Sequence, residues 1–247
     1  MNKLLASIMA VLVLAGTAFA GSGIRVERVQ FAKGNTSAFI KGKLKGDADV
    51  DYLVNAGAGQ TIAVSLKGSN RMNYFNVLPP GSDDVAMHVG DTGEDYSGML
   101  PDDGDYKVRV YLVRAAARRN ESSDYTVTIS VTGRHLAPAP ASQDALVPGT
   151  RFHASANITG LTYIDTFGDR APKQCQAFVI RRGTDGTATV EIPQGSSAPR
   201  RILFVKGKPA ASDSSSQMTF ARRGDVTIVT FEGGEFYEIP DAFVFGG

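Results

Sequence analysis

The chain has 247 residues, with 26 lysines and arginines against 25 aspartates and glutamates, one cysteine and no tryptophan. A net charge this close to zero argues against a nucleic-acid binder, which needs a surplus of basic residues. A single cysteine excludes an internal disulfide and a cysteine-rich metal site. The histidines His88, His135 and His153 are far apart in sequence, which disfavours a catalytic zinc. The composition therefore predicts neither a metal nor another cofactor.

Residues 1–20 have the layout of a secretory signal peptide. Lys3 provides a basic start, an apolar run extends to Leu14, and Ala18 and Ala20 provide a small-residue cleavage site. This apolar run is too short to span a membrane as a helix, and no later run is long enough. We therefore expect a periplasmic or secreted protein without a membrane span.

Period-two alternation of apolar residues recurs through residues 24–133. The segment 60–66 is typical, because Ile62, Val64 and Leu66 alternate with small or polar residues. Further strands are expected at 52–56, 74–78, 106–113 and 125–131, with turn signals rich in glycine, proline and aspartate between them. This pattern predicts an all-β fold, with an antiparallel β-sandwich as the first domain.

Between the last two of these strands lies the one good helix-forming stretch, residues 113–119. Five to seven residues cannot hold a helix alone, so we expect a turn or a short helix there. Residues 134–145 then form a linker, because Pro-x-Pro spacing with small and polar residues favours an extended spacer.

A second small β domain is expected at 146–247. Strands are predicted at 175–182, 187–192, 201–205, 225–231 and 235–239, joined in part by tight turns at 183–186, 206–208 and 232–234. These elements form a β meander. Three arginine doublets, Arg181-Arg182, Arg200-Arg201 and Arg222-Arg223, lie near strand ends, where solvated hairpin ends are the default interpretation and a shared basic rim is the alternative.

The first domain resembles two related families. Its segments DYLVNAGAGQTIAVSL, YFNVLPPGS, GMLPDDGDYKVRVYLV and DYTVTISV resemble the bacterial pre-peptidase C-terminal β-sandwich. The segments VQFAKGNTSA, at 29–38, and VYLVRAAARRNE, at 110–121, are closer to the periplasmic inhibitors of goose-type (g-type) lysozyme. The resemblance covers about 110 residues, essentially 24–133. The second domain is similar to uncharacterised exported bacterial proteins, in which a second cysteine often accompanies the counterpart of Cys175.

The resemblance implies an exported binding protein whose partner is a g-type lysozyme. An inhibitor of such an enzyme needs donors that engage the carboxyl groups of its glycan-binding cleft, and arginine bonds a carboxylate with both arms of its fork. By the family pattern, Arg114 and Arg118 fill this role, Tyr52 is a nearby contact, and Arg119 is a weaker candidate. Tyr111 either lies exposed beside these arginines or faces the other side of its sheet.

Each of these assignments has an alternative. The arginines of 114–119 can belong to a solvated loop in which they pair with Glu121 or Asp124, and Tyr52 can be a packed core residue. No Gly-x-Ser-x-Gly or HExxH motif is present, so we expect no enzyme. Cys175 begins an apolar strand and is expected to be an inert thiol. The rival function is a general cell-envelope module that contacts cell-wall glycan, and an accessory domain of a secreted hydrolase is a third.

Overall fold

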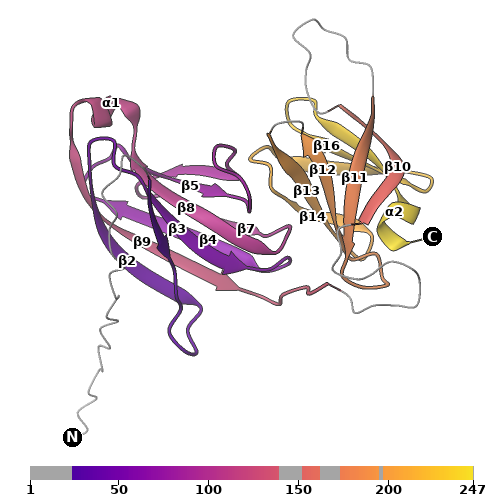
Figure 1. The fold of residues 1–247 in the computed structure, drawn as a ribbon, viewed down its shortest axis with the longest axis horizontal. Helices are drawn as coiled ribbons and strands as arrows, with labels where there is room; N and C mark the ends of the chain where they lie inside the picture. The colour runs from indigo at the N-terminus through magenta and orange to yellow at the C-terminus, as the bar shows by residue number, and fades with distance from the viewer. Residues whose placement is uncertain (1–23, 139–151, 162–172, 195–196, 247) are drawn as a thin grey trace, which may run out of the picture.

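The computed structural model describes residues 24–138, 152–161, 173–194 and 197–246, so the predicted signal peptide, 1–20, lies outside the described residues (Figure 1). The first nine strands form two sheets that pack face to face. One sheet has the order β1-β3-β8-β5-β6 and contains β1 (Arg25–Arg28), β3 (Val50–Ala56), β8 (Gly104–Leu112), β5 (Asn73–Leu78) and β6 (His88–Asp91). The other has the order β2-β9-β4-β7 and contains β2 (Ser37–Lys45), β9 (Ser122–Thr132), β4 (Thr61–Gly68) and β7 (Asp95–Met99).

The alternation seen in the sequence produces the core between these two sheets. In β4, Ile62, Val64 and Leu66 are fully buried, while the residues between them lie on the outer face. The same period fills the core from β3, β8 and β9, since successive side chains of a strand point to opposite faces. The predicted all-β fold is confirmed. One departure from an antiparallel sandwich is β1, which pairs in parallel with β3.

The later strands form one eight-stranded antiparallel sheet, with the order β14-β13-β12-β11-β10-β17-β16-β15. Its members are β10 (Phe152–Leu161), β11 (Lys173–Arg181), β12 (Ala188–Gln194), β13 (Ser197–Val205), β14 (Lys208–Ser212), β15 (Met218–Arg223), β16 (Val226–Phe231) and β17 (Phe236–Pro240). Strands that are consecutive in the chain pair with each other, except β14 and β15, which lie at the two edges of the sheet. The pairing of β10 with β17 joins the first and last of these strands, and the sheet surrounds its own core. The predicted meander and its three tight turns are present.

Several elements were not predicted from the sequence. They are the strands β1, β2, β6, β7, β10, β14 and β15, and the helix α2 (Asp241–Phe245). Most of these strands are short or lie at a sheet edge, where polar residues weaken the alternation and pairing with a neighbour decides the conformation. The helix α2 has only five residues, and burial of Phe243 and Val244 holds it in place.

Strand β8 connects the two ends of the sandwich. Its nine residues span about 30 Å, and it runs from the turn that contains Asp102 and Asp103 to the helix α1 (Arg114–Arg118). The eight-stranded sheet lies beside the first of these ends, where β14 contacts β7, and α1 projects at the far end (Figure 1). The two ends of the sandwich are therefore separate surfaces.

Candidate functional site

The helix α1 is a short, anchored connection between β8 and β9. Its five residues are too few to be stable alone, and the fixed point is Ala116, which is completely buried. The backbone N–H of Val113 donates to the carbonyl of Met72 at 3.0 Å, which ties the start of the helix to a neighbouring turn. Asn120, with φ of 53°, ends the turn in the left-handed region that asparagine tolerates. The predicted short helix is confirmed, and the burial of Ala116 and the hydrogen bond from Val113 to Met72 anchor its backbone to the sandwich.

Arg114 and Arg118 lie exposed on α1, one helical turn apart and therefore on the same side of the helix. Within the described part of the chain, neither guanidinium group has a hydrogen bond or an ion pair. Both forks are therefore free to bind a carboxylate from another molecule.

Arg119 is different, because its Nε lies 2.6 Å from Glu121 Oε1. Asn70 donates to the second oxygen of the same carboxylate at 2.8 Å, and these two contacts, that of Asn70 first, lower the pKa of Glu121. Asp124 lies 3.5 Å from Lys43. The expected pairing of the loop arginines with Glu121 or Asp124 thus holds for Arg119 alone, which leaves Arg114 and Arg118 as the stronger candidates.

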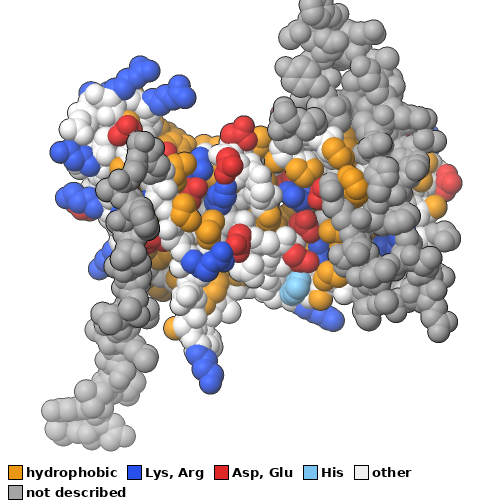
Figure 2. Space-filling view, in the orientation of Figure 1, with side chains coloured by type: hydrophobic (Ala, Val, Ile, Leu, Met, Phe, Trp, Pro, Cys, Tyr) orange, Lys and Arg blue, Asp and Glu red, His pale blue; other side chains and the backbone are white. Residues whose placement is uncertain are grey.

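The neighbourhood of α1 is basic. Figure 2 shows Lys and Arg side chains gathered at the end of the molecule where α1 lies. The backbone N–H of Gly46 donates to the carbonyl of Glu121 at 2.8 Å, so the end of β2, with exposed Lys45, lies against this loop. We call the surface formed by Arg114, Arg118, Arg119 and Lys45 the α1 pole.

Tyr111 precedes α1 and lies on the outer face of its sheet. The side chain is half-buried, its hydroxyl donates to Asn76 Oδ1 at 3.0 Å, and its ring centroid lies 6.2 Å from that of Tyr74. Burial raises the pKa of the phenol. Of the two positions considered for Tyr111, the outer face of the sheet is the one observed, and part of the ring remains accessible below the α1 pole.

The structure corrects the expectation that Tyr52 contacts a partner. Tyr52 is only 1% exposed, and its hydroxyl lies 2.7 Å from that of Tyr125 inside the sandwich. The alternation of β3 directs Tyr52 to the same face as Val54, so the core interpretation applies. A partner at the surface cannot touch this side chain, and Tyr52 is not part of the site.

The other chemically reactive residues are engaged or not described. His88 lies 3.0 Å from Glu94 and stacks on Tyr96, and His135 lies 2.8 Å from Asp103. Cys175 lies in β11, where its backbone pairs with that of Ile158. Its side chain is not among those that the structure describes. Where side chains are described, no group of three His, Cys, Asp or Glu is placed to hold a metal ion.

In two of the three arginine doublets one arginine is buried, which the sequence did not predict. The default interpretation as solvated hairpin ends holds for Arg222 and Arg223, which are exposed and pair with Asp241 of α2 and Glu238 of β17. It is wrong for Arg182 and Arg201, which are buried against the turn before β8. No signal in the sequence distinguishes these doublets, because Arg182 and Arg201 contact residues of the sandwich that lie 80 and 121 positions away in the chain.

The comparisons with known proteins concern about half of the chain. No protein-family model matches the sequence. The chain is 30% identical, over 129 residues, to the inhibitor of g-type lysozyme of Escherichia coli K12, a match that covers 51% of this chain and 93% of that protein. In the described part of the chain, no helix has the length and apolar character needed to cross a membrane.

Two solved structures of periplasmic inhibitors of g-type lysozyme are also similar. The inhibitor from Aeromonas hydrophila is 38% identical, with 44% of this chain and 97% of that chain covered and a TM-score of 0.42. The inhibitor from Salmonella Typhimurium is 29% identical, with 44% and 98% covered and a TM-score of 0.35.

Proposed function

This chain belongs to the family of g-type lysozyme inhibitors, and from that premise we propose that it binds a g-type lysozyme and inhibits it through the α1 pole. The observation that supports this surface most is the pair of exposed guanidinium groups of Arg114 and Arg118 without partners in the described structure. We place the protein in the periplasm, since its relatives are periplasmic and residues 1–20 resemble a signal peptide.

The mechanism follows from what a lysozyme cleft contains. Glycosidases of this kind cleave their substrate with carboxyl groups set in a groove that fits a polysaccharide. Arg114 and Arg118 lie on one side of a projecting turn and present two planar forks to such carboxylates. Each fork makes two charge-assisted hydrogen bonds and keeps its charge when partly desolvated. The inhibitor thereby blocks the glycan from the cleft without any chemical step, so it acts as a binding protein and not as an enzyme.

The anchoring of α1 favours binding energetically. Ala116 is buried and the N–H of Val113 is hydrogen-bonded to Met72, so the backbone of the loop is already ordered. Binding therefore loses mainly the rotamer freedom of the arginine side chains, and a smaller entropic cost leaves more net affinity. Arg119 supports this geometry through Glu121 and need not touch the partner.

The test is an inhibition assay with three lysozyme classes. Purified full-length protein is added to g-type, c-type and i-type lysozymes, and lysis of peptidoglycan is followed by turbidity. We expect inhibition of the g-type enzyme. Absence of that inhibition would reject the proposal, and pull-down of the protein by peptidoglycan alone would then support the rival function, a glycan-binding envelope module.

A further inference from the structure

The end of the sandwich opposite α1 is covered by the eight-stranded sheet through two buried arginines. Arg182, just after β11, and Arg201, in β13, both point at the turn between β7 and β8. That turn holds Asp102 and Asp103, and the loop after β5 contributes Pro80. We call this contact the arginine clamp, formed by Arg182, Arg201, Asp102 and Asp103.

Arg182 uses every arm of its guanidinium group, and its side chain is 0% exposed. Its Nη2 donates to Asp102 Oδ1 at 2.8 Å and its Nη1 to Asp103 Oδ2 at 2.7 Å. Nη1 also donates to the carbonyl of Leu136 at 2.9 Å, and Nε donates to Thr189 Oγ1 at 3.0 Å. The single guanidinium group of Arg182 thus links three segments, which are the turn before β8, the segment that follows β9, and the strand β12.

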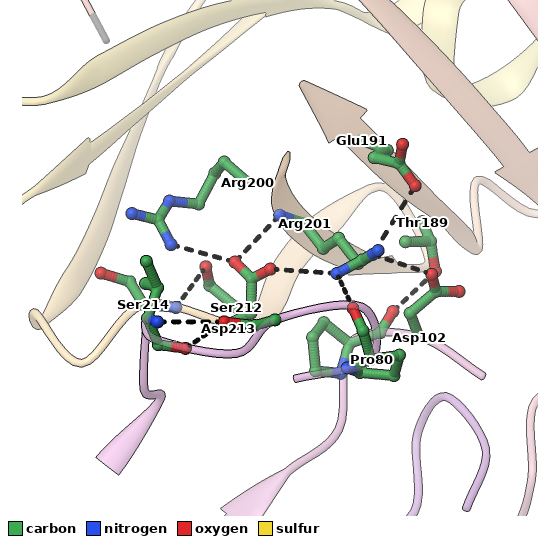
Figure 3. Close-up of polar contacts among 12 residues, drawn as sticks. Pro80, Asp102, Thr189, Glu191, Arg200, Arg201, Ser212, Asp213 and Ser214 are labelled. Carbon is green, nitrogen blue, oxygen red and sulfur yellow. Dashed lines mark hydrogen bonds and ion pairs between the residues drawn. The ribbon is translucent and has the colours of Figure 1, made fainter. Parts of the chain in front are cut away.

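Arg201 is held from both sides. On the sandwich side, its Nε lies 3.1 Å from Asp102 Oδ2 and its Nη1 donates to the carbonyl of Pro80 at 3.0 Å (Figure 3). On its own side, the backbone N–H of Arg201 donates to Asp213 Oδ1 at 2.9 Å. Asp213 also accepts from Arg200 at 3.0 Å, so the acid that orients Arg201 is itself fixed.

An apolar contact accompanies the clamp. Ala58 of the sandwich is fully buried with Leu203 and Ala211 of the eight-stranded sheet, and Leu136 packs against this group. The N–H of Ala58 donates to Asp103 at 2.8 Å, and the carbonyl of Ala58 accepts from the N–H of Leu136 at 2.8 Å. The first residues of the predicted linker, 134–138, are therefore attached at this interface; the remainder, 139–145, lies outside the described residues.

These contacts have different consequences. The apolar patch favours association but is small and has no directional preference. The charges are directional, because any other arrangement that buries Arg182 or Asp102 leaves a charge without its partner, at a high cost. Two independent domains joined by a flexible linker would not need buried charges that pair with each other.

We propose that the predicted domains 24–133 and 146–247 are docked permanently in one orientation by the arginine clamp, so that the second domain serves as a fixed partner of the first. The interaction surface on the first domain is the acidic turn at Asp102 and Asp103, and the complementary surface is the buried arginine pair. Docking at this end leaves the α1 pole open. The inference does not depend on lysozyme inhibition.

The test uses the full chain with a site-specific protease sequence inserted within 139–145. After cleavage, the two halves are analysed by size-exclusion chromatography with light scattering. We expect the halves to elute together at the mass of the whole chain. The variant Arg182→Leu is expected to elute as two separate halves, whereas Arg223→Leu, an exposed arginine of the same sheet, should elute as the parent does.

A second variant on the opposite surface, Asp102→Ala/Asp103→Ala, guards against misfolding of the Arg182→Leu protein and is expected to separate the halves as well. Separation of the parent halves, or co-elution in both clamp variants, would overturn the proposal. Lysozyme inhibition is measured in parallel on the uncleaved proteins and is expected to be the same for the parent and Arg182→Leu, so failure of the clamp and failure of the inhibitor function are distinguished.

Discussion

The hydroxyl of Tyr52 lies 2.7 Å from the hydroxyl of Tyr125, and this hydrogen bond joins the two sheets of the sandwich across the core. Tyr52 comes from β3 and Tyr125 from β9, and they are 1% and 4% exposed. Burial is the main cause that raises the pKa of both phenols, so both stay neutral. One hydroxyl can therefore donate its proton to the oxygen of the other. Tyr52 therefore supports the structure of the first domain from the inside.

Removal of both hydroxyls should cost less stability than the two single removals added together. Tyr125→Phe leaves the Tyr52 hydroxyl buried without its partner, and such a group costs about 1–3 kcal/mol. In Tyr52→Phe/Tyr125→Phe neither polar group remains, so the loss should be smaller than the sum of the two single losses. Urea unfolding of the four proteins measures this coupling. Strictly additive losses would contradict the proposed pairing.

Gly42 is expected to be essential to the position of Tyr125. A Cβ built at Gly42 would overlap the ring carbons and the hydroxyl of Tyr125. We expect Gly42→Ala to destabilise the protein by about 1–3 kcal/mol, as overpacking of a filled core does.

The matched control for this substitution is Gly42→Ala in a Tyr125→Ala background, where the added methyl group has room. There the glycine substitution should cost much less, as measured by urea unfolding. An equal cost in both backgrounds would mean that the backbone of β2, and not the Tyr125 ring, requires glycine.

Asp105 is expected to make the stability of the first domain depend on pH in the acid range. Hydrogen bonds from Arg28 and then from Asn55 lower its pKa to about 2. The folded-state pKa lies below the unfolded value of about 3.9. The stabilisation that ionised Asp105 provides is therefore fully present above that value and is lost as the pH falls toward 2. The stability difference between the parent and Asp105→Asn should therefore be constant from pH 7 to 5 and shrink at lower pH. A difference independent of pH would contradict this assignment.

Arg114 and Arg119 should respond differently to substitution. Arg114 has no partner in the described structure, so Arg114→Ala is expected to weaken lysozyme inhibition with no change in unfolding free energy. Arg119 pairs with Glu121, so Arg119→Ala should have the smaller effect on inhibition. Exposed pairs such as this one contribute at most about 1 kcal/mol to stability. Inhibition constants and urea unfolding of both variants decide the point, and a larger loss of inhibition in Arg119→Ala would reverse the assignment.

The sequence alone predicts those parts of the fold that depend on local pattern. Ile62, Val64 and Leu66 identify β4 because a half-buried strand requires their spacing. Gly207 identifies a hairpin because glycine readily adopts the positive φ that a tight turn needs, and its φ is 74° in the structure. Short edge strands such as β1 and β6 have no such pattern, since pairing with a neighbour stabilises them.

Prediction of the candidate site was partial for a related reason. The resemblance of residues 110–121 identified the arginines, but the state of each guanidinium group depends on whether an acid lies nearby in three dimensions. Arg119 has Glu121 beside it, whereas Arg114 and Arg118 do not have such a partner in the described structure. Likewise, Arg182 and Arg222 are both members of doublets near strand ends, and only the fold shows that the first is buried against another part of the chain.

The most direct test of inhibition through the α1 pole is the affinity of a purified g-type lysozyme for three full-length proteins, measured by isothermal titration calorimetry. These are the parent, Arg114→Ala/Arg118→Ala, and Arg222→Ala/Arg223→Ala, which removes the same charge from the far sheet. Central arginines of an interface each contribute about 2 kcal/mol or more, so the first double variant should bind at least about 100-fold more weakly. The second double variant should bind as the parent does. Equal affinity of the parent and Arg114→Ala/Arg118→Ala would contradict inhibition through the α1 pole.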